Sequence, residues 1–198
     1  MAAQKLPPEE SDHIGFIKIV VSIMNPSPDV LELARNYTHL VLPPQDTPVP
    51  LTYVRRKIPM VYWKYFLHEE SATHILHLTG VNYDFVSVPV HDIVLAVHCL
   101  NIRKLVTIRV SRKVVNAKPM LLVENVPHIA SFLVLLRWLY TNDENELVAA
   151  LRIGGDEMLL GFAQNWRFWG VISSEVIEVL KKLMESKYIT ISYREVPD

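Results

Sequence analysis

Residues 125–143 read NVPHIASFLVLLRWLYTND, and in this stretch hydrophobic spacing and boundary signals agree. Pro127 suits the first turn of a helix, where a backbone N–H has no partner. Thr141, Asn142 and Asp143 are short polar residues that end the apolar run by competing for the backbone. The run is too short to cross a bilayer, which takes about 20 apolar residues. We expect a buried core helix whose apolar residues recur at helical spacing: Ile129, Phe132, Leu133, Leu136, Leu139 and Tyr140.

The segments around this helix predict a small sheet and further helices. Apolar and polar residues alternate over residues 74–79 and 85–90, and residues 80–84 carry turn formers, which is typical of a hairpin. A helix is expected over residues 91–101 and a short strand over residues 119–126. Further helices are expected from Asp143 to Gly154-Gly155, over residues 158–169 and over residues 175–186. The fold class predicted is α+β, a small sheet packed on a helix cluster.

The first third of the chain predicts an extension with its own helix and strands. Residues 1–13 are polar and contain Pro7-Pro8, which indicates a flexible leader. Residues 14–23 form a β-branched run that predicts a strand, and Ser27 can cap a short helix that starts at Pro28. Residues 51–70 predict a strand before Pro59, then either a short helix or a strand. The chain is thus divided into a leader (1–13), an α/β extension (14–70) and a main domain (71–198).

Composition is typical of a folded globular chain. Of the 198 residues, 50% are hydrophobic and 21% charged, and the formal net charge is -1. No global field therefore selects nucleic acid, anionic lipid or acidic substrates. A single cysteine, Cys99, excludes an internal disulfide and fits a reducing compartment. The first residues lack the apolar centre of a secretory signal, so we expect an intracellular protein.

Candidate catalytic groups do not form a recognisable set. His68, His74 and His77 are candidate metal ligands, but His74 and His77 are three apart on a strand, so their side chains point to opposite faces. Cys99 beside His98 could suggest a thiolate, yet both lie in an apolar helix, where a structural cysteine is expected. No nucleophile elbow or phosphate-binding glycine loop is present. We therefore expect no catalytic, cofactor, metal or small-molecule site, and no membrane segment.

Basic residues offer one alternative function. Arg55, Arg56 and Lys57 form a first group, and a second group follows the predicted helix at residues 91–101: Arg103, Lys104, Arg109, Arg112, Lys113 and Lys118. If they met on one face, they could contact phosphates and bind nucleic acid directly. No aromatic residues are interleaved with them as a nucleic-acid reading surface would require. Direct nucleic-acid binding is therefore the alternative hypothesis and not the main one.

Two segments together resemble the BTB/POZ domain family. They are FVSVPVHDIVLAVHCLNIRKL (residues 85–105) and SFLVLLRWLYTND (residues 131–143), and the resemblance extends over about residues 71–187. The matching positions are His91, Val94, Leu95, Ala96, Cys99, Phe132, Leu135, Leu136, Leu139, Tyr140 and Thr141. This resemblance implies a protein–protein interaction module, either a homodimer or an adaptor for transcription factors or a cullin-type ligase subunit. The chain departs from the family in having Thr73-His74-Ile75 where an acidic residue is usual, and in its Pro-rich N-terminal segment.

The resemblance also implies which residues meet a partner. The family uses its hairpin and first helix as an interaction surface, which corresponds here to residues 75–88 and 91–100. The predicted partner-binding residues combine this surface with the basic group: Ile75, Leu76, Leu78, Val86, Val88, His91, Val94, Leu95, Arg109, Arg112 and Lys113.

A narrower resemblance is carried by LLRWLYT (residues 135–141) and FAQNWRFWGVI (residues 162–172). Together they are similar to the fungal clampless proteins, which regulate sexual development. This resemblance implies an adaptor that restrains mating-type or cell-cycle transcription factors, with a nuclear or cytoplasmic location.

Overall fold

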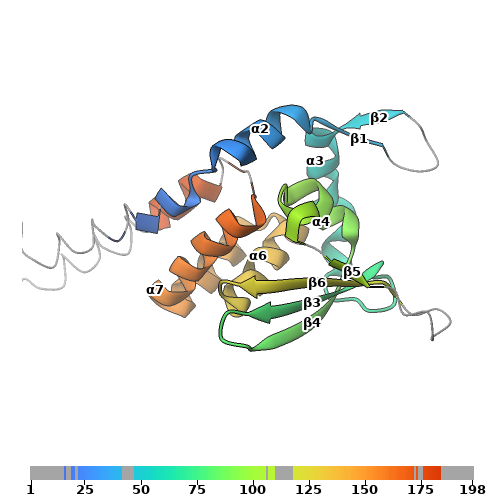
Figure 1. The fold of residues 1–198 in the computed structure, drawn as a ribbon. Helices are drawn as coiled ribbons and strands as arrows, with labels where there is room; N and C mark the ends of the chain where they lie inside the picture. The colour runs from blue at the N-terminus through green and yellow to red at the C-terminus, as the bar shows by residue number, and fades with distance from the viewer. Residues whose placement is uncertain are drawn as a thin grey trace, which may run out of the picture.

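The computed structural model describes residues 16, 19–20, 22–41, 47–105, 107–109, 118–171, 173 and 176–183, with the backbone only at 33, 103 and 107–109. The fold is α+β, as predicted, and Figure 1 shows the helices gathered on one side of a small sheet. The elements in chain order are α2 (Pro28–Asn36), β1 (His39–Val41), β2 (Pro48–Pro50), α3 (Leu51–Tyr62), the 3-10 turn η1 (Trp63–Tyr65), β3 (His74–Gly80), β4 (Phe85–Val90), α4 (Asp92–His98), α5 (Ile102–Leu105), β5 (Thr107–Arg109), β6 (Met120–Val126), α6 (Ile129–Thr141) and α7 (Glu144–Trp169), followed by helical residues 176–183.

Helix α6 is the predicted core helix. The side chain of His128 caps its start by accepting a hydrogen bond from the Ser131 N–H at 3.1 Å, and Asn142 ends it in the left-handed conformation with φ 51°. Phe132 is fully buried and stacks on Trp169 of α7, with 4.6 Å between ring centroids. The predicted helix is confirmed because its apolar side chains lie in the core, among them Phe132, Leu135, Leu136, Leu139 and Tyr140.

The main sheet has the strand order β4-β3-β6-β5. Strands β3 and β4 form the predicted antiparallel hairpin, in which Leu76 lies opposite Val88. Strand β6 lies parallel to β3, and β4, α4, α5 and β5 lie in the connection between them. One sheet face is covered by helices, because Leu76, Val88, Leu121 and Val123 are all buried in the same core as α6.

Helix α7 has a break at Gly154-Gly155, where the sequence predicts one. Gly155 has a non-helical φ of 67° and ψ of −156°, so two helical segments meet there at a kink, and the second runs to Trp169. Beyond the kink, Asn165 is fully buried and donates hydrogen bonds to the His128 carbonyl at 2.6 Å and to the Ser131 hydroxyl at 2.9 Å. These bonds tie the middle of α7 to the start of α6.

Two predicted strands near the N-terminus are helices instead. The described members of residues 14–23, namely Phe16, Ile19, Val20, Ser22 and Ile23, are helical. Val20 and Met24 are buried at a spacing of four residues, so packing of one helical face outweighs the strand preference of β-branched residues.

The predicted strand before Pro59 is also wrong, because residues 51–62 form α3. Leu51, Val54 and Ile58 are buried at helical spacing, and this packing holds the helix across Pro59 despite the lost backbone hydrogen bond. The leader at residues 1–13 lies outside the described residues. The division of the chain at residue 70 stays a prediction.

Candidate protein-interaction surface

Strand β4 is an open edge of the main sheet (Figure 1). It pairs with β3 on one side, and none of the strands that the structure describes pairs with its other side. The Ile75 N–H donates to the Pro119 carbonyl at 3.0 Å, so the odd-numbered residues of β3 point their backbone groups away from β4. In this register, Phe85, Ser87 and Pro89 direct their backbone groups to the open side. Pro89 lacks an N–H, which is tolerated at a sheet edge.

The hairpin has one core face and one outer face. Leu76, Leu78 and Val88 are buried, while Phe85 and Ser87 are exposed on the other face. Residues on the outer face include half-buried Ile75, His77, Thr79, Pro89 and Leu122, with exposed Met120 beside them on β6. The outer face is therefore mixed in polarity and reachable from solvent.

The end of the hairpin exposes large apolar side chains, and we call Val81, Tyr83 and Phe85 the hairpin tip. Their exposed fractions are 53%, 90% and 72%. The turn is closed by the Gly80 N–H, which donates to the Asp84 carbonyl at 2.8 Å, and Tyr83 has φ 64°. The His77 ring stacks on Phe85 at 5.8 Å, so Phe85 is held in place although it is exposed.

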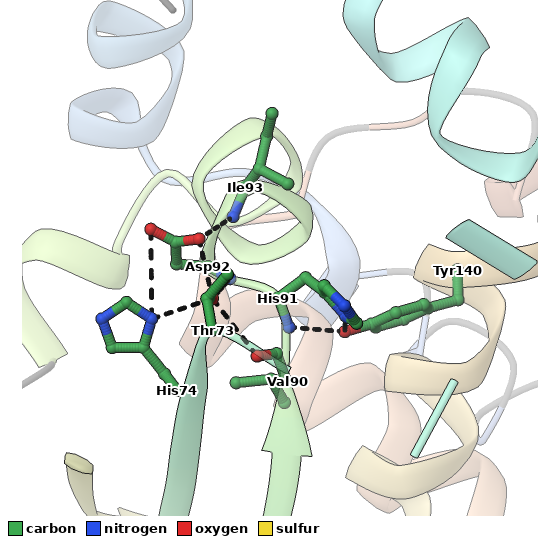
Figure 2. Close-up of polar contacts among 7 residues, drawn as sticks. All are labelled: Thr73, His74, Val90, His91, Asp92, Ile93 and Tyr140. Atoms are coloured by element: carbon green, nitrogen blue, oxygen red, sulfur yellow. Dashed lines mark hydrogen bonds and ion pairs between the residues drawn. The ribbon is translucent and has the colours of Figure 1, made fainter. Parts of the chain in front are cut away.

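A polar network fixes the hairpin to the start of α4, as Figure 2 shows. The Thr73 hydroxyl donates to the Asp92 carboxylate at 2.9 Å and accepts from the Asp92 N–H at 2.9 Å. The same carboxylate accepts from the Ile93 N–H at 3.0 Å, which suits a negative charge in the first turn of a helix. His74 Nδ1 lies 2.9 Å from the Thr73 hydroxyl and 4.0 Å from the carboxylate. These hydrogen bonds hold the base of the hairpin against the start of α4.

His91 links this network to α6. Its N–H donates to the Tyr140 hydroxyl at 2.8 Å, and its Nδ1 lies 3.1 Å from the same oxygen (Figure 2). The hydroxyl can donate its own proton to Nδ1 when the imidazole proton is on Nε2. Burial lowers the pKa of His91, against a hydrogen bond to the Ser71 backbone and the Asp92 charge, which raise it. Burial also raises the pKa of Tyr140 to about 12, so both groups are neutral.

The predicted partner-binding residues fall into three sets. Ile75 and Val86 are half-buried on the hairpin. Six are buried core residues: Leu76, Leu78, Val88, His91, Val94 and Leu95. Of the basic residues, Arg109 lies on β5 opposite Met120, whereas Arg112 and Lys113 lie outside the described residues. Within the predicted hairpin surface, the accessible side chains are therefore those of the outer face and the tip.

The first basic group does not lie on one face. Arg55 turns inward and donates through Nε to the Val97 carbonyl at 2.6 Å, whereas Arg56 and Lys57 are exposed. Lys118 donates to the backbone carbonyls of Glu69 and Glu70. No described contact brings the two basic groups together.

Sequence reasoning did not single out Tyr83 and Phe85. The signal was present, since alternation places Phe85 on the same side as Ser87 and opposite the buried valines. A large aromatic residue on the polar side of a strand is the informative exception, because it exposes apolar surface that the core does not need.

Reactive groups are buried or scattered in the described part of the chain. Cys99 is fully buried and burial raises the pKa of its thiol, as expected for a structural cysteine. Within the described ranges, no three His, Cys, Asp or Glu side chains gather as metal ligands would, and none of the helices carries an apolar stretch able to span a membrane. A groove of about 470 Å³ is lined by Glu144, Asn145, Val148, Ala149, Arg152, Val179, Lys182 and Leu183, a set without a histidine, cysteine or serine.

Comparison with known proteins finds no protein-family model that matches this chain and no match among curated proteins. The resemblance to the BTB/POZ and clampless families therefore stays a prediction from the residues quoted above.

Proposed function

We propose that this protein is a non-catalytic protein–protein interaction module that binds through the β3–β4 hairpin. The observation that carries the proposal is the open edge of β4 beside the exposed hairpin tip, on a hairpin fixed to α4 and α6. An unpaired strand edge accepts a strand from another chain through backbone hydrogen bonds.

Two sources of affinity lie side by side on this hairpin. The outward backbone groups of Phe85 and Ser87 offer hydrogen bonds to an added strand, and the aromatic rings of Tyr83 and Phe85 offer apolar anchors. Aromatic anchors dominate many interfaces because they bury large areas with few rotatable bonds. Since His77 already holds the Phe85 ring, binding has less side-chain freedom to remove.

The resemblance to the BTB/POZ family supports the identity of the partners. Under this proposal, the protein acts in the nucleus or the cytoplasm as an adaptor or regulator of transcription, cell-cycle or developmental factors. Its partner is a transcription factor, a cullin-type ligase subunit or a second copy of the chain.

Ser87→Pro is the sharpest test of the edge. The Ser87 N–H points to the open side, so proline removes one edge donor without removing a β3–β4 hydrogen bond. Ser87→Ala is the matched control, because both variants lose the 2.8 Å contact between the Ser87 hydroxyl and His77 Nδ1. Wild type and both variants would be compared by sedimentation equilibrium and by quantitative affinity purification from the native organism.

We expect wild type and Ser87→Ala to self-associate or to recover the same partner proteins, and Ser87→Pro to lose them. Phe85→Ser should weaken binding as well, by about 1–2 kcal/mol for one exposed anchor. A monomer at high concentration that recovers no specific partner would contradict the proposal. Equal recovery by Ser87→Pro and Ser87→Ala would show that the edge is not used.

A further inference from the structure

Helix α3 and η1, which precede the hairpin in the chain, carry a second exposed surface. Leu51, Val54 and Ile58 fix one side of α3 in the core. The opposite side and η1 bear the α3 outer face, which we define as Tyr53, Arg56, Lys57, Met60, Trp63 and Lys64. These residues are spaced three and four apart, so they lie along one stripe of the helix.

Large apolar side chains on this face are strongly exposed. The exposed fractions of Tyr53, Met60 and Trp63 are 51%, 65% and 59%. Val61 on α3 and Leu67, which follows η1, are also exposed, at 49% and 45%. Exposed apolar residues scattered singly need no explanation, but several along one helix mark an interaction site.

Positive charge is interleaved with these apolar side chains, so the expectation that no aromatic residues lie among the basic ones is wrong for α3 and η1. Residues 47–68 contain no Asp or Glu, and their charged residues are Arg55, Arg56, Lys57 and Lys64. Lys57 Nζ lies 5.7 Å from the centre of the Tyr53 ring and 3.9 Å from the Met60 sulfur, and Lys64 Nζ lies 5.0 Å from the Tyr65 ring centre. Among the described residues, Arg56, Lys57 and Lys64 form no ion pair with a carboxylate.

We propose that the α3 outer face docks an acidic amphipathic segment of a partner protein, in which Asp or Glu alternates with large apolar residues. The three cations lack carboxylate partners within the described chain, so an acidic peptide supplies the complementary charge. Tyr, Trp, Met and Arg are also the residue types enriched where proteins meet.

A protein segment fits this face better than a lipid surface. In a helix that lies on a membrane, the apolar and basic residues occupy separate faces. Here they share one stripe, and α3 cannot roll to separate them because its other side is packed in the core. The proposal adds a surface that does not use the β4 edge, although it shares with the proposed function the premise that this chain binds proteins.

The test uses the full chain and three fluorescent probes. The first is a helical peptide of about 20 residues with Glu and Leu or Trp at spacings of three and four. The second has the same apolar positions with Lys in place of Glu, and the third is an anionic phosphatidylserine vesicle. The variant Arg56→Glu with Lys57→Glu is matched by Lys104→Glu with Lys182→Glu, since Lys104 and Lys182 are exposed cations elsewhere.

We expect the acidic peptide to bind wild type and the control, and the Arg56/Lys57 variant to bind at least about tenfold more weakly. Trp63→Ala, a change at an exposed site, should weaken binding with the charge unchanged, and Ser87→Pro should leave it unaltered. Equal binding of the acidic and basic peptides, unchanged affinity of the charge-reversed variant, or capture by the vesicles alone would overturn the proposal. If Ser87→Pro loses its partners while the peptide never binds, this proposal fails and the proposed function stands.

Discussion

His98 makes the stability of this protein depend on pH. Its Nε2 is buried without a hydrogen-bond partner in the described part of the structure, and its ring packs edge-on against Trp138. Burial and then the charge of Arg55 lower the pKa of His98 to about 3, from an ordinary value of 6.5. Below pH 6.5, His98 therefore binds a proton in the unfolded chain but not in the native protein. Stability is present above this pH and is lost as the pH falls toward 3.

We predict that His98→Gln, which cannot titrate, reduces this pH dependence. Between pH 7 and pH 4.5, the free energy of unfolding of wild type should fall by about 2 kcal/mol more than that of the variant. Urea unfolding at both pH values measures this difference, and any loss that the substitution itself causes cancels between them. The lowered pKa of His91 leaves some pH dependence in both proteins. Identical pH profiles would show that His98 is protonated freely in the native state.

At the scale of the element, the kink in α7 depends on Gly155. Its φ of 67° and ψ of −156° belong to a region that side chains with a Cβ essentially never adopt. A Cβ placed there meets no atom within 4 Å, so the cost of Gly155→Ala comes from the backbone and not from a clash. We predict a loss of about 1–3 kcal/mol in the free energy of unfolding.

Ile153→Ala is the control for this prediction, since Ile153 lies on the same helix and its side chain is 88% exposed. It should change stability by no more than about 0.5 kcal/mol. D-alanine at position 155, introduced by chemical ligation, should be tolerated because its allowed region mirrors that of the L-residue. A Gly155→Ala protein as stable as wild type would mean that α7 can straighten at no cost.

Sequence alone predicts the elements whose local pattern and packing agree. Helix α6, the β3–β4 hairpin and β6 follow from spacing, turn residues and alternation, and Gly154-Gly155 marks the position of the kink. The described residues within 14–23 and α3 were mispredicted because their β-branched and aromatic residues favour strands locally. Only the buried positions, such as Val54 and Ile58, reveal the helical face that the core selects.

The exposed surfaces are harder to predict because they depend on the fold and not on a local sequence pattern. The open edge of β4 depends on the strand order, which no local pattern contains. The α3 outer face exists only if residues 51–62 are helical. A strand would place Tyr53 and Lys57 on one face and Met60 on the other. Exposed apolar residues can be recognised once the fold shows which side of each element is buried.

At the scale of the whole molecule, α3 and the segments after residue 70 share one core. Leu51, Val54 and Ile58 belong to the same hydrophobic cluster as Val97 of α4 and Leu135 of α6. Arg55 adds a hydrogen bond to the Val97 carbonyl. Tyr62 and Tyr65 pack on His91, with ring centroids 5.1 and 5.9 Å apart from its ring. A shared core couples the stability of its parts, because opening one exposes apolar surface on the other.

We therefore predict that α3 and α6 unfold together. Native-state hydrogen exchange followed by mass spectrometry would compare peptides covering residues 51–62 and 129–141 in increasing urea. The slowest amides of both helices should exchange with the same free energy of opening, which is the global value. A fragment of residues 71–198 should be less stable than the full chain, since removing α3 uncovers Val97 and its neighbours. If α3 instead lost protection at lower urea while α6 kept it, the extension before residue 71 would be an independent unit that docks on a self-sufficient domain.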